Sequence, residues 1–136
     1  MKYKKNRFIY FDEADSAGVL FFGNIYRISH QALEEFIQHI GIKWEDWFDD
    51  KLIGAPIVHA DTQFKRPIKA GDTYAIHICC FKLSQSTVGF QLDYIHNDSE
   101  EIHAVVKTVH TFIDKAKLEK TKMPQIFHER LNRYLI

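Results

Sequence analysis

The chain has 136 residues, with 18 basic and 18 acidic side chains and a formal net charge of zero. This length fits one domain, residues 1–136, and the balanced charge gives no electrostatic field for binding nucleic acid or an anionic membrane surface. No segment approaches the ~20 consecutive apolar residues of a membrane span and the basic start lacks the apolar part of a secretory signal, so we expect a cytoplasmic protein.

The first predicted element is a strand over residues 5–11, with the sequence KNRFIYF. Phe8 and Tyr10 share one face, while Ile9 and Phe11 share the other, because successive side chains of a strand point to opposite sides. Both faces are apolar, so the pattern predicts a strand that is buried on both sides. Residues 12–18, DEADSAG, have the composition of a loop.

The longest helical pattern of the chain follows this loop. Its apolar residues have the i, i+3, i+4 spacing of one buried stripe, and they are Ile25, Ile28, Ala32, Leu33, Phe36, Ile37 and Ile40. Asn24 is a suitable N-cap, and Gly41 a suitable residue after the last turn. The sequence therefore predicts a helix of four to five turns that begins beside the DEADSAG loop.

A helix N-terminus next to an acidic loop can support chemistry on a carbonyl group. Its unpaired N–H groups carry about half a positive charge and can stabilise an oxyanion. A loop carboxylate, Asp12 or Asp15, can attack the carbonyl or activate a water molecule. From the residues alone, the alternative is that these aspartates only cap a turn.

The rest of the chain predicts mainly long strands. Trp44, Trp47 and Phe48 have helical spacing, which indicates one or two helical turns or, alternatively, a packed loop. Alternating apolar residues then predict strands over 57–64, 73–83, 87–96 and 101–113, separated by turns. A terminal helix over 124–135 is expected to contribute Ile126, Phe127, Leu131, Tyr134 and Leu135 to the core.

This order of elements predicts an α+β domain in which one helix covers one face of an antiparallel sheet. Long strands leave sheet edges that need covering, and pairing with a second copy covers them. We therefore expect a homo-oligomer, either a dimer or a dimer of dimers (a homotetramer). The adjacent Cys79 and Cys80 point to opposite faces of a strand and form no disulfide framework.

Three stretches of the chain resemble the hotdog-fold acyl-CoA thioesterases, specifically the 4-hydroxybenzoyl-CoA thioesterase group. They are FDEADSAGVLFFGNIYRISHQALEEF, GAPIVHA and FKRPIKAGD. The resemblance covers nearly the whole chain and implies a long central helix wrapped by an antiparallel sheet. The PIVHA and FKRP…GD segments, with HQALEE on the helix, are most similar to the branch that hydrolyses 1,4-dihydroxy-2-naphthoyl-CoA.

The resemblance assigns roles to three residues around the helix N-terminus. It implies that Asp15 is the nucleophile or the general base, that Gly18 allows close approach of the backbone to the substrate, and that the backbone N–H near Phe22 polarises the thioester oxygen. Ser16 stands where the family usually has Ala, Pro or Gly. No cofactor is implied, because coenzyme A is part of the substrate.

Several side chains on the helix and the following strand are candidates for binding the substrate. His30 either lines the acyl pocket or forms a surface pair with Glu34, four residues later. Glu34 or Glu35 is the alternative carboxylate, because a related thioesterase group carries its essential carboxylate on this helix. His59 contacts the acyl group or a partner subunit, or else is a hydrogen-bonded core histidine.

Other histidines give no sign of a site. His59 and Asp61 share a face without a third ligand, and there is no HExxH motif, so no metal is predicted. His96, His103 and His110 recur every seventh residue, a period that alternates faces in a strand, so this spacing does not indicate a site.

The phosphates of coenzyme A need basic or hydrogen-bonding partners. The candidates are Lys65, Arg66, Lys69, Lys82 and Ser86. Phe21 and Phe22 either form the wall of an acyl pocket or belong to the core. The predicted function is hydrolysis of an aromatic acyl-CoA, and the alternatives are a thioesterase for short aliphatic acyl groups or a non-catalytic protein that binds CoA esters.

Overall fold

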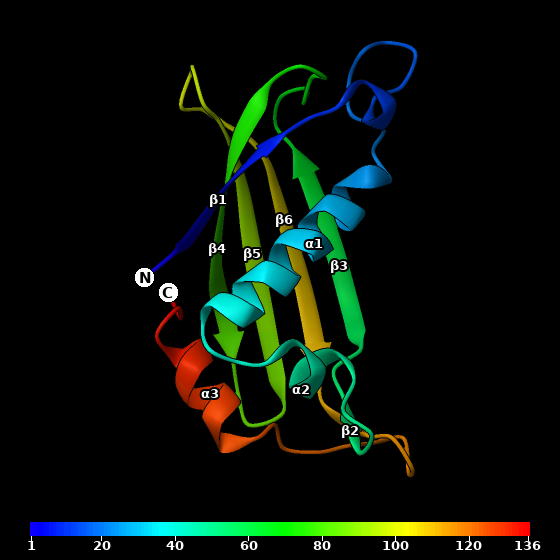
Figure 1. The fold of residues 1–136 in the computed structure, drawn as a ribbon, viewed down its shortest axis with the longest axis vertical. Coiled ribbons are helices and arrows are strands. Elements are labelled where there is room, and N and C mark those ends of the chain that lie inside the picture. The colour runs from blue at the N-terminus through cyan, green and yellow to red at the C-terminus, as the bar shows by residue number, and fades with distance from the viewer.

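The computed structural model describes all 136 residues and contains the predicted antiparallel sheet. The sheet has five strands in the order β1-β4-β5-β6-β3. Their bounds are β1 Tyr3–Phe8, β3 Ile57–Phe64, β4 Thr73–Leu83, β5 Thr87–His96 and β6 Ile102–Thr111. One long helix, α1 (Asn24–His39), crosses one face of this sheet (Figure 1). The predicted α+β architecture is confirmed.

The core forms between α1 and the three central strands. The predicted stripe of α1 is buried, and Phe36 and Ile37 have no exposed surface. The face of β4 that meets the helix, which carries Tyr74, Ile76, Ile78 and Cys80, is equally buried. Apolar alternation therefore predicted the packed face of the sheet correctly, because each inward side chain gains free energy by leaving water.

The predicted cap at the start of α1 is wrong. The N-cap residue is Gly23, and Asn24 is the first helical residue, with its Nδ2 donating to the carbonyl oxygen of Glu13 at 2.9 Å. Asn24 thus ties the helix to the preceding loop instead of capping it. At the other end the prediction is confirmed, because Gly41 follows the helix with a φ of +89°.

The first strand is shorter and more exposed than predicted. β1 ends at Phe8, and a 3-10 turn over Phe11–Glu13 replaces its last predicted residues. Ile9 is fully buried, but Phe8 is 43% exposed and Phe11 is 92% exposed. β1 is an edge strand that pairs only with β4, and its face with Lys4, Asn6 and Phe8 is exposed.

Short elements close the end of the sheet that lies away from the DEADSAG loop. They are α2 (Trp44–Phe48), β2 (Ile53–Gly54), β7 (Ile113–Asp114), β8 (Glu119–Lys120) and α3 (Gln125–Asn132). Trp47 stacks on Phe127 with ring centroids 5.3 Å apart, which joins α2 to α3. The predicted core role of Ile126 and Leu135 is wrong, because both are over a third exposed. No helix is long and apolar enough to cross a membrane.

The second edge strand, β3, is exposed along almost its whole length. Val58 is 60% exposed, and Ile57 and Phe64 are each nearly half exposed, although β3 pairs with β6 on its other side. An edge with unpaired backbone groups and apolar side chains is a surface that natural proteins usually cover. The two cysteines on β4 are both free and buried, and burial raises the pKa of Cys80 to about 12.

Candidate active site

A buried carboxylate holds the DEADSAG loop in place. Both oxygens of Glu13 accept from the guanidinium of Arg7 at 2.7 Å, and Oε2 also accepts from Arg27 at 3.0 Å. The backbone N–H of Tyr10 donates to the same carboxylate at 2.9 Å. The hydrogen bonds from Arg7 are the main reason that the pKa of Glu13 falls to about 2. The network joins β1, the loop and α1.

The loop itself is a tight turn that presents the Asp15 carboxylate to solvent. Oδ1 of Asp15 accepts from the backbone N–H of Ala17 at 2.8 Å, and the carbonyl oxygen of Asp15 accepts from the N–H of Gly18 at 3.1 Å. Gly18 has a φ of +78°, a conformation that glycine adopts without strain. The turn bond uses one lone pair of one oxygen, so the carboxylate retains free acceptor sites.

The start of α1 supplies free backbone donors. The N–H groups of Asn24 and Ile25 donate to the carbonyl oxygens of Phe21 and Phe22, whereas the N–H groups of Phe22 and Gly23 have no acceptor within the chain. Free N–H groups at a helix N-terminus attract developing negative charge. Asp15 and Gly18 lie in the turn that leads into this helix start, and Phe22 immediately precedes it.

A groove of about 350 Å³ runs beside Phe22. Its walls come from Val19, Leu20 and Phe22, from Phe64 at the end of β3, and from the segment after β3, which includes Lys65 and Arg66. Lys69 is also close to the loop, because its backbone pairs with Val19. Arg66 contacts Glu101 at 3.1 Å in an exposed ion pair. Three of the five predicted phosphate-binding side chains therefore lie near the helix start.

The other two predicted phosphate partners lie elsewhere. Lys82 and Ser86 are at the β4–β5 hairpin, whereas Thr73, at the opposite end of β4, pairs with Phe8 beside the loop. Ser86 is also buried, with 7% of its surface exposed. Within a single chain, neither residue belongs to the Asp15 site, because eleven strand residues separate the two ends of β4.

Phe21 and Phe22 are surface residues and not core residues. Phe21 is 48% exposed and Phe22 is 69% exposed, and their rings contact each other with centroids 5.0 Å apart. The core interpretation is therefore wrong for both. The two exposed aromatic rings lie beside the free backbone donors, and only Phe22 lines the groove.

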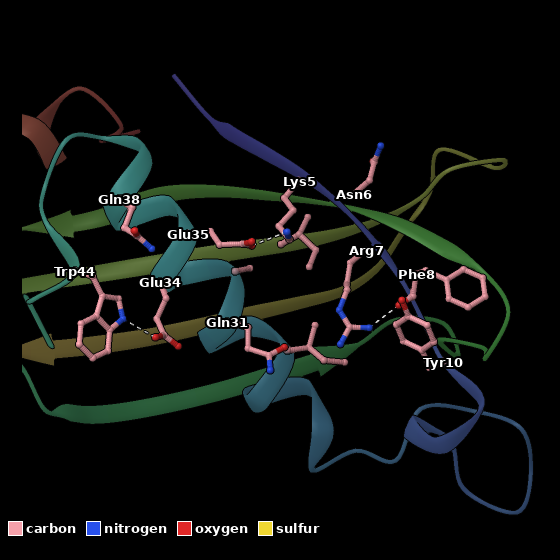
Figure 2. A pocket seen from close by; sticks show the side chains of 13 residues that line it. Lys5, Asn6, Arg7, Phe8, Tyr10, Gln31, Glu34, Glu35, Gln38 and Trp44 are labelled. Atoms are coloured by element: carbon pink, nitrogen blue, oxygen red, sulfur yellow. Dashed lines mark hydrogen bonds and ion pairs between the residues drawn. The ribbon is translucent and has the colours of Figure 1, made fainter.

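The alternative carboxylates on α1 line a different groove. Figure 2 shows this space of about 590 Å³ between β1 and α1, with Glu35 paired to Lys5 at 2.6 Å and Glu34 accepting from Nε1 of Trp44 at 2.9 Å. Each carboxylate already has a protein partner, and the DEADSAG loop does not line this groove.

The two predicted histidines have acidic partners. Nδ1 of His30 lies 3.2 Å from Glu34, and the His30 ring also lines a cavity beside α2 and β2. The predicted pair of His30 with Glu34 is confirmed, and the role of His30 in an acyl pocket stays a prediction. His59 lies 2.8 Å from Asp61 on the exposed strand β3, so it is not a core histidine.

Sequence reasoning missed Glu13 and His110. Glu13 was overlooked because its partners Arg7 and Arg27 are distant along the chain. His110 was dismissed on its spacing, yet it is 2% exposed and lines the same cavity as His30. The same spacing argument also missed that His96 and His103 stack across the β5–β6 hairpin, with ring centroids 5.0 Å apart. Only the assembled sheet shows which of these rings face inward.

The chain is similar in sequence to known thioesterases over most of its length. A profile of the thioesterase-like superfamily matches residues 9–131. A 1,4-dihydroxy-2-naphthoyl-CoA hydrolase of Nostoc punctiforme is 32% identical over 91% of this chain and 82% of its own length. The enzyme of the same name from Microcystis aeruginosa is 34% identical over 88% of this chain and 85% of its own.

Solved structures share the fold. A 1,4-dihydroxy-2-naphthoyl-CoA thioesterase from Synechocystis superposes with a TM-score of 0.89 at 20% identity, over 97% of this chain and 96% of the other. The corresponding thioesterase of Staphylococcus aureus gives 0.86 at 16% identity, over 97% and 89%. The predicted hotdog fold and the predicted class of enzyme, a thioester hydrolase, are confirmed. The chain belongs to the thioesterase-like superfamily.

Proposed function

We propose that this protein hydrolyses an aromatic acyl-CoA, with 1,4-dihydroxy-2-naphthoyl-CoA as its substrate. The observation that supports the proposal is an exposed loop carboxylate, Asp15, in the loop that Glu13 ties to the start of α1, where the N–H groups of Phe22 and Gly23 are free. The names of the relatives from Nostoc and Microcystis support the identity of the acyl group. The exposed rings of Phe21 and Phe22 suit a flat aromatic substrate.

The proposed reaction uses the free donors and the free carboxylate together. The thioester oxygen accepts from the N–H groups of Phe22 and Gly23, which stabilise the negative charge that develops on it. Asp15 then acts as the nucleophile, releasing the CoA thiolate and leaving an anhydride that water hydrolyses, or as the general base for that water. Either route consumes one water and yields the free acid and the CoA thiol.

The basic side chains beside the groove are placed to meet the phosphates of coenzyme A. Lys65 and Arg66 line the groove next to Phe22, and Lys69 flanks the loop. Arginine and lysine bind phosphate oxygens through charge-assisted hydrogen bonds. Arg66 exchanges its exposed pair with Glu101 for a phosphate at little cost, because exposed ion pairs contribute little stability.

A homodimer through β3 completes the proposed assembly. If β3 pairs antiparallel with the β3 of a second copy over its full length, the two-fold axis passes between Ala60 and Asp61. Phe64 of one chain then lies beside Ile57 of the partner subunit. The groove of Phe22 is thereby brought next to the partner's cavity, which His30 lines. His59, near the axis, contacts the partner subunit.

Val58→Asp is expected to convert this dimer into monomers without unfolding the chain. Val58 is 60% exposed in the single chain, so the aspartate stays hydrated there, but strand pairing would place its charge in the interface. Light scattering coupled to gel filtration measures the change in mass. Leu118→Asp, at a 76% exposed apolar residue outside β3, is the matched control and should leave the mass unchanged. A native chain that is monomeric contradicts the pairing.

The function is tested by the release of free thiol from a panel of CoA esters. The panel holds 1,4-dihydroxy-2-naphthoyl, 4-hydroxybenzoyl and short to long aliphatic esters. The proposal predicts that kcat/KM is highest for the naphthoyl ester. Preference for a short aliphatic ester contradicts the proposed substrate, and binding of all esters without thiol release supports a non-catalytic CoA-ester-binding protein.

A further inference from the structure

A largely apolar cavity that contains two histidines, His30 and His110, lies under α1 at the end of β3 that is far from the Phe22 groove. An open part of about 420 Å³ adjoins a closed part of about 30 Å³, and His30, Ile57 and His110 line both. The volume of the open part falls in the ~300–1,000 Å³ range of ligand pockets. Trp47 and Phe48 form an aromatic wall. Neither part of this cavity is lined by a group of the Asp15 loop.

The hydrogen bonds of His110 set the position of its proton. Nδ1 lies 3.0 Å from the carbonyl oxygen of Ala55, and because a carbonyl only accepts, Nδ1 carries the hydrogen. Nε2 is therefore an acceptor in the neutral ring, and it lies 3.2 Å from the hydroxyl of Thr108. Burial lowers the pKa of His110, which keeps the ring neutral. The Thr108 hydroxyl donates to this nitrogen, so a ligand hydroxyl can donate to the oxygen of Thr108 or replace Thr108 as the donor to Nε2.

His110 is too far from Asp15 of its own chain to share a substrate with it. His110 pairs with Ile57, whereas the Phe22 groove is lined by Phe64. Seven strand residues separate these ends of β3, which is about 23 Å at ~3.3 Å per residue. In the β3-paired dimer, however, Ile57 of the partner subunit lies beside Phe64. An acyl group bound by one chain's Phe22 N–H therefore points towards the cavity of the other chain.

We propose that His110, with the hydroxyl of Thr108, determines specificity for a ring hydroxyl on the acyl group of a thioester attacked by Asp15 of the partner subunit. This inference rests on the proposed function and adds a substrate feature to it. A phenolic hydroxyl donates to Nε2 of His110 or to the oxygen of Thr108. An aromatic ester that lacks the hydroxyl cannot make this hydrogen bond, and His110 and Thr108 then bond only to each other and to Ala55, so such an ester binds less tightly.

Binding of free acids tests the recognition without any hydrolysis. The probes are 1,4-dihydroxy-2-naphthoate and 2-naphthoate, and Trp47 fluorescence reports their Kd values. Native protein is expected to bind the dihydroxy acid about tenfold more tightly. His110→Asn keeps an amide donor near the position of Nδ1 but removes the acceptor at Nε2, so this preference should fall to about twofold or less. His110→Gln, which retains an acceptor near Nε2, should restore much of it.

Two controls separate recognition from structure. Thr108→Val removes only a hydroxyl and should also reduce the preference, even if the His110 variants fold poorly. His77→Phe changes a histidine on the outer face of β4 and should leave both Kd values unchanged. Three results would each overturn the proposal. His110→Asn could raise the Kd of both acids equally, native protein could show no preference between the acids, or it could bind neither. If native protein still binds the dihydroxy acid more tightly than 2-naphthoate but hydrolyses no CoA ester, the proposed function is contradicted and the role of His110 in recognition is not.

Mixing two variant chains tests whether the site spans both subunits. Asp15→Asn and His110→Asn chains, refolded together in equal amounts, form heterodimers in half of the molecules. If the site takes Asp15 and His110 from different chains, each heterodimer contains one intact site, so about a quarter of native activity towards the dihydroxynaphthoyl ester returns. If both residues serve the same chain's site, no intact site forms and activity stays at about one-tenth of native, which overturns the cross-subunit assignment.

Discussion

Asp15→Asn is expected to lower kcat for hydrolysis of the preferred CoA ester by about 10³-fold, with KM changed less than about threefold. The amide is neither a nucleophile nor a base at neutral pH, so the interaction lost is one made in the transition state. The fold should not change. Asp15 is exposed, and the asparagine Oδ1 still accepts from the N–H of Ala17.

Asp12→Asn is the matched control for this substitution. Asp12 lies three residues earlier in the same segment and is also exposed, but no hydrogen bond holds its carboxylate towards the helix start. Its removal should change kcat by less than about threefold, because an exposed surface charge has only a weak effect on a nearby site. Stopped-flow or endpoint detection of free thiol measures both variants with the same ester.

Equal activity of Asp15→Asn and native protein would remove Asp15 from the reaction. Glu34 and Glu35 would then be the carboxylates to test, despite their contacts with Trp44 and Lys5. If kcat falls equally in Asp12→Asn and Asp15→Asn, hydrolysis depends on the total negative charge of the loop. It would then not depend on one reactive carboxylate.

Glu13→Gln is expected to lower the free energy of unfolding at pH 7 by about 3 kcal/mol. The substitution leaves the guanidinium of Arg7, which is 16% exposed, without its carboxylate partner. The substitution keeps the hydrogen bond from Asn24 to the backbone oxygen of residue 13. The loop of the variant should therefore keep its conformation, although fewer side-chain contacts stabilise it. Urea unfolding followed by tryptophan fluorescence measures the change.

The pH dependence of this stability follows from the depressed pKa of Glu13. The pKa in the folded state is about 2, against an ordinary value of 4.5, mainly because of the hydrogen bonds from Arg7. A lowered pKa stabilises the fold above pH 4.5, and this stability is lost as the pH falls from 4.5 towards 2. The difference between native protein and Glu13→Gln should therefore narrow from about 3 kcal/mol at pH 7 to about 1 kcal/mol at pH 3.

Glu35→Gln provides the comparison for an exposed ion pair. The Glu35 side chain is 47% exposed and contacts Lys5, so water and salt screen the interaction. Its loss should cost less than about 1 kcal/mol at any pH. If Glu13→Gln costs no more than Glu35→Gln, the buried network does not hold the loop.

The sequence alone predicted the elements whose patterns are local. The strands over residues 57–64, 73–83 and 87–96 agree with the structure residue for residue. Their apolar alternation and their turns depend only on neighbours along the chain. The helix stripe of α1 and the turn at Gly41 are predictable for the same reason. The loop motif likewise led to Asp15 and Phe22, because the catalytic proposal needs a carboxylate and a helix start that are adjacent in sequence.

Two of the failures show how the surroundings of a residue override its local pattern. The aromatic residues after Phe8 have the pattern of a strand buried on both sides, but β1 is at a sheet edge, where one face meets solvent. Asn24 has the composition of a cap, but the carbonyl oxygen of Glu13 is within reach of its side chain and the helix starts one residue earlier. Burial is decided by the position of a strand in the sheet, which periodicity does not encode.

By itself, the sequence determined the α+β order of elements, the inward faces of the strands and the acidic loop before the main helix, because these depend on hydrophobic period and turn chemistry. Only the tertiary structure decided that Arg7, Glu13 and Arg27 form one buried network and that His110 faces a cavity with His30. These contacts join residues from different elements. They exist because the sheet order places those elements together, and no local pattern records which distant side chain will be the neighbour.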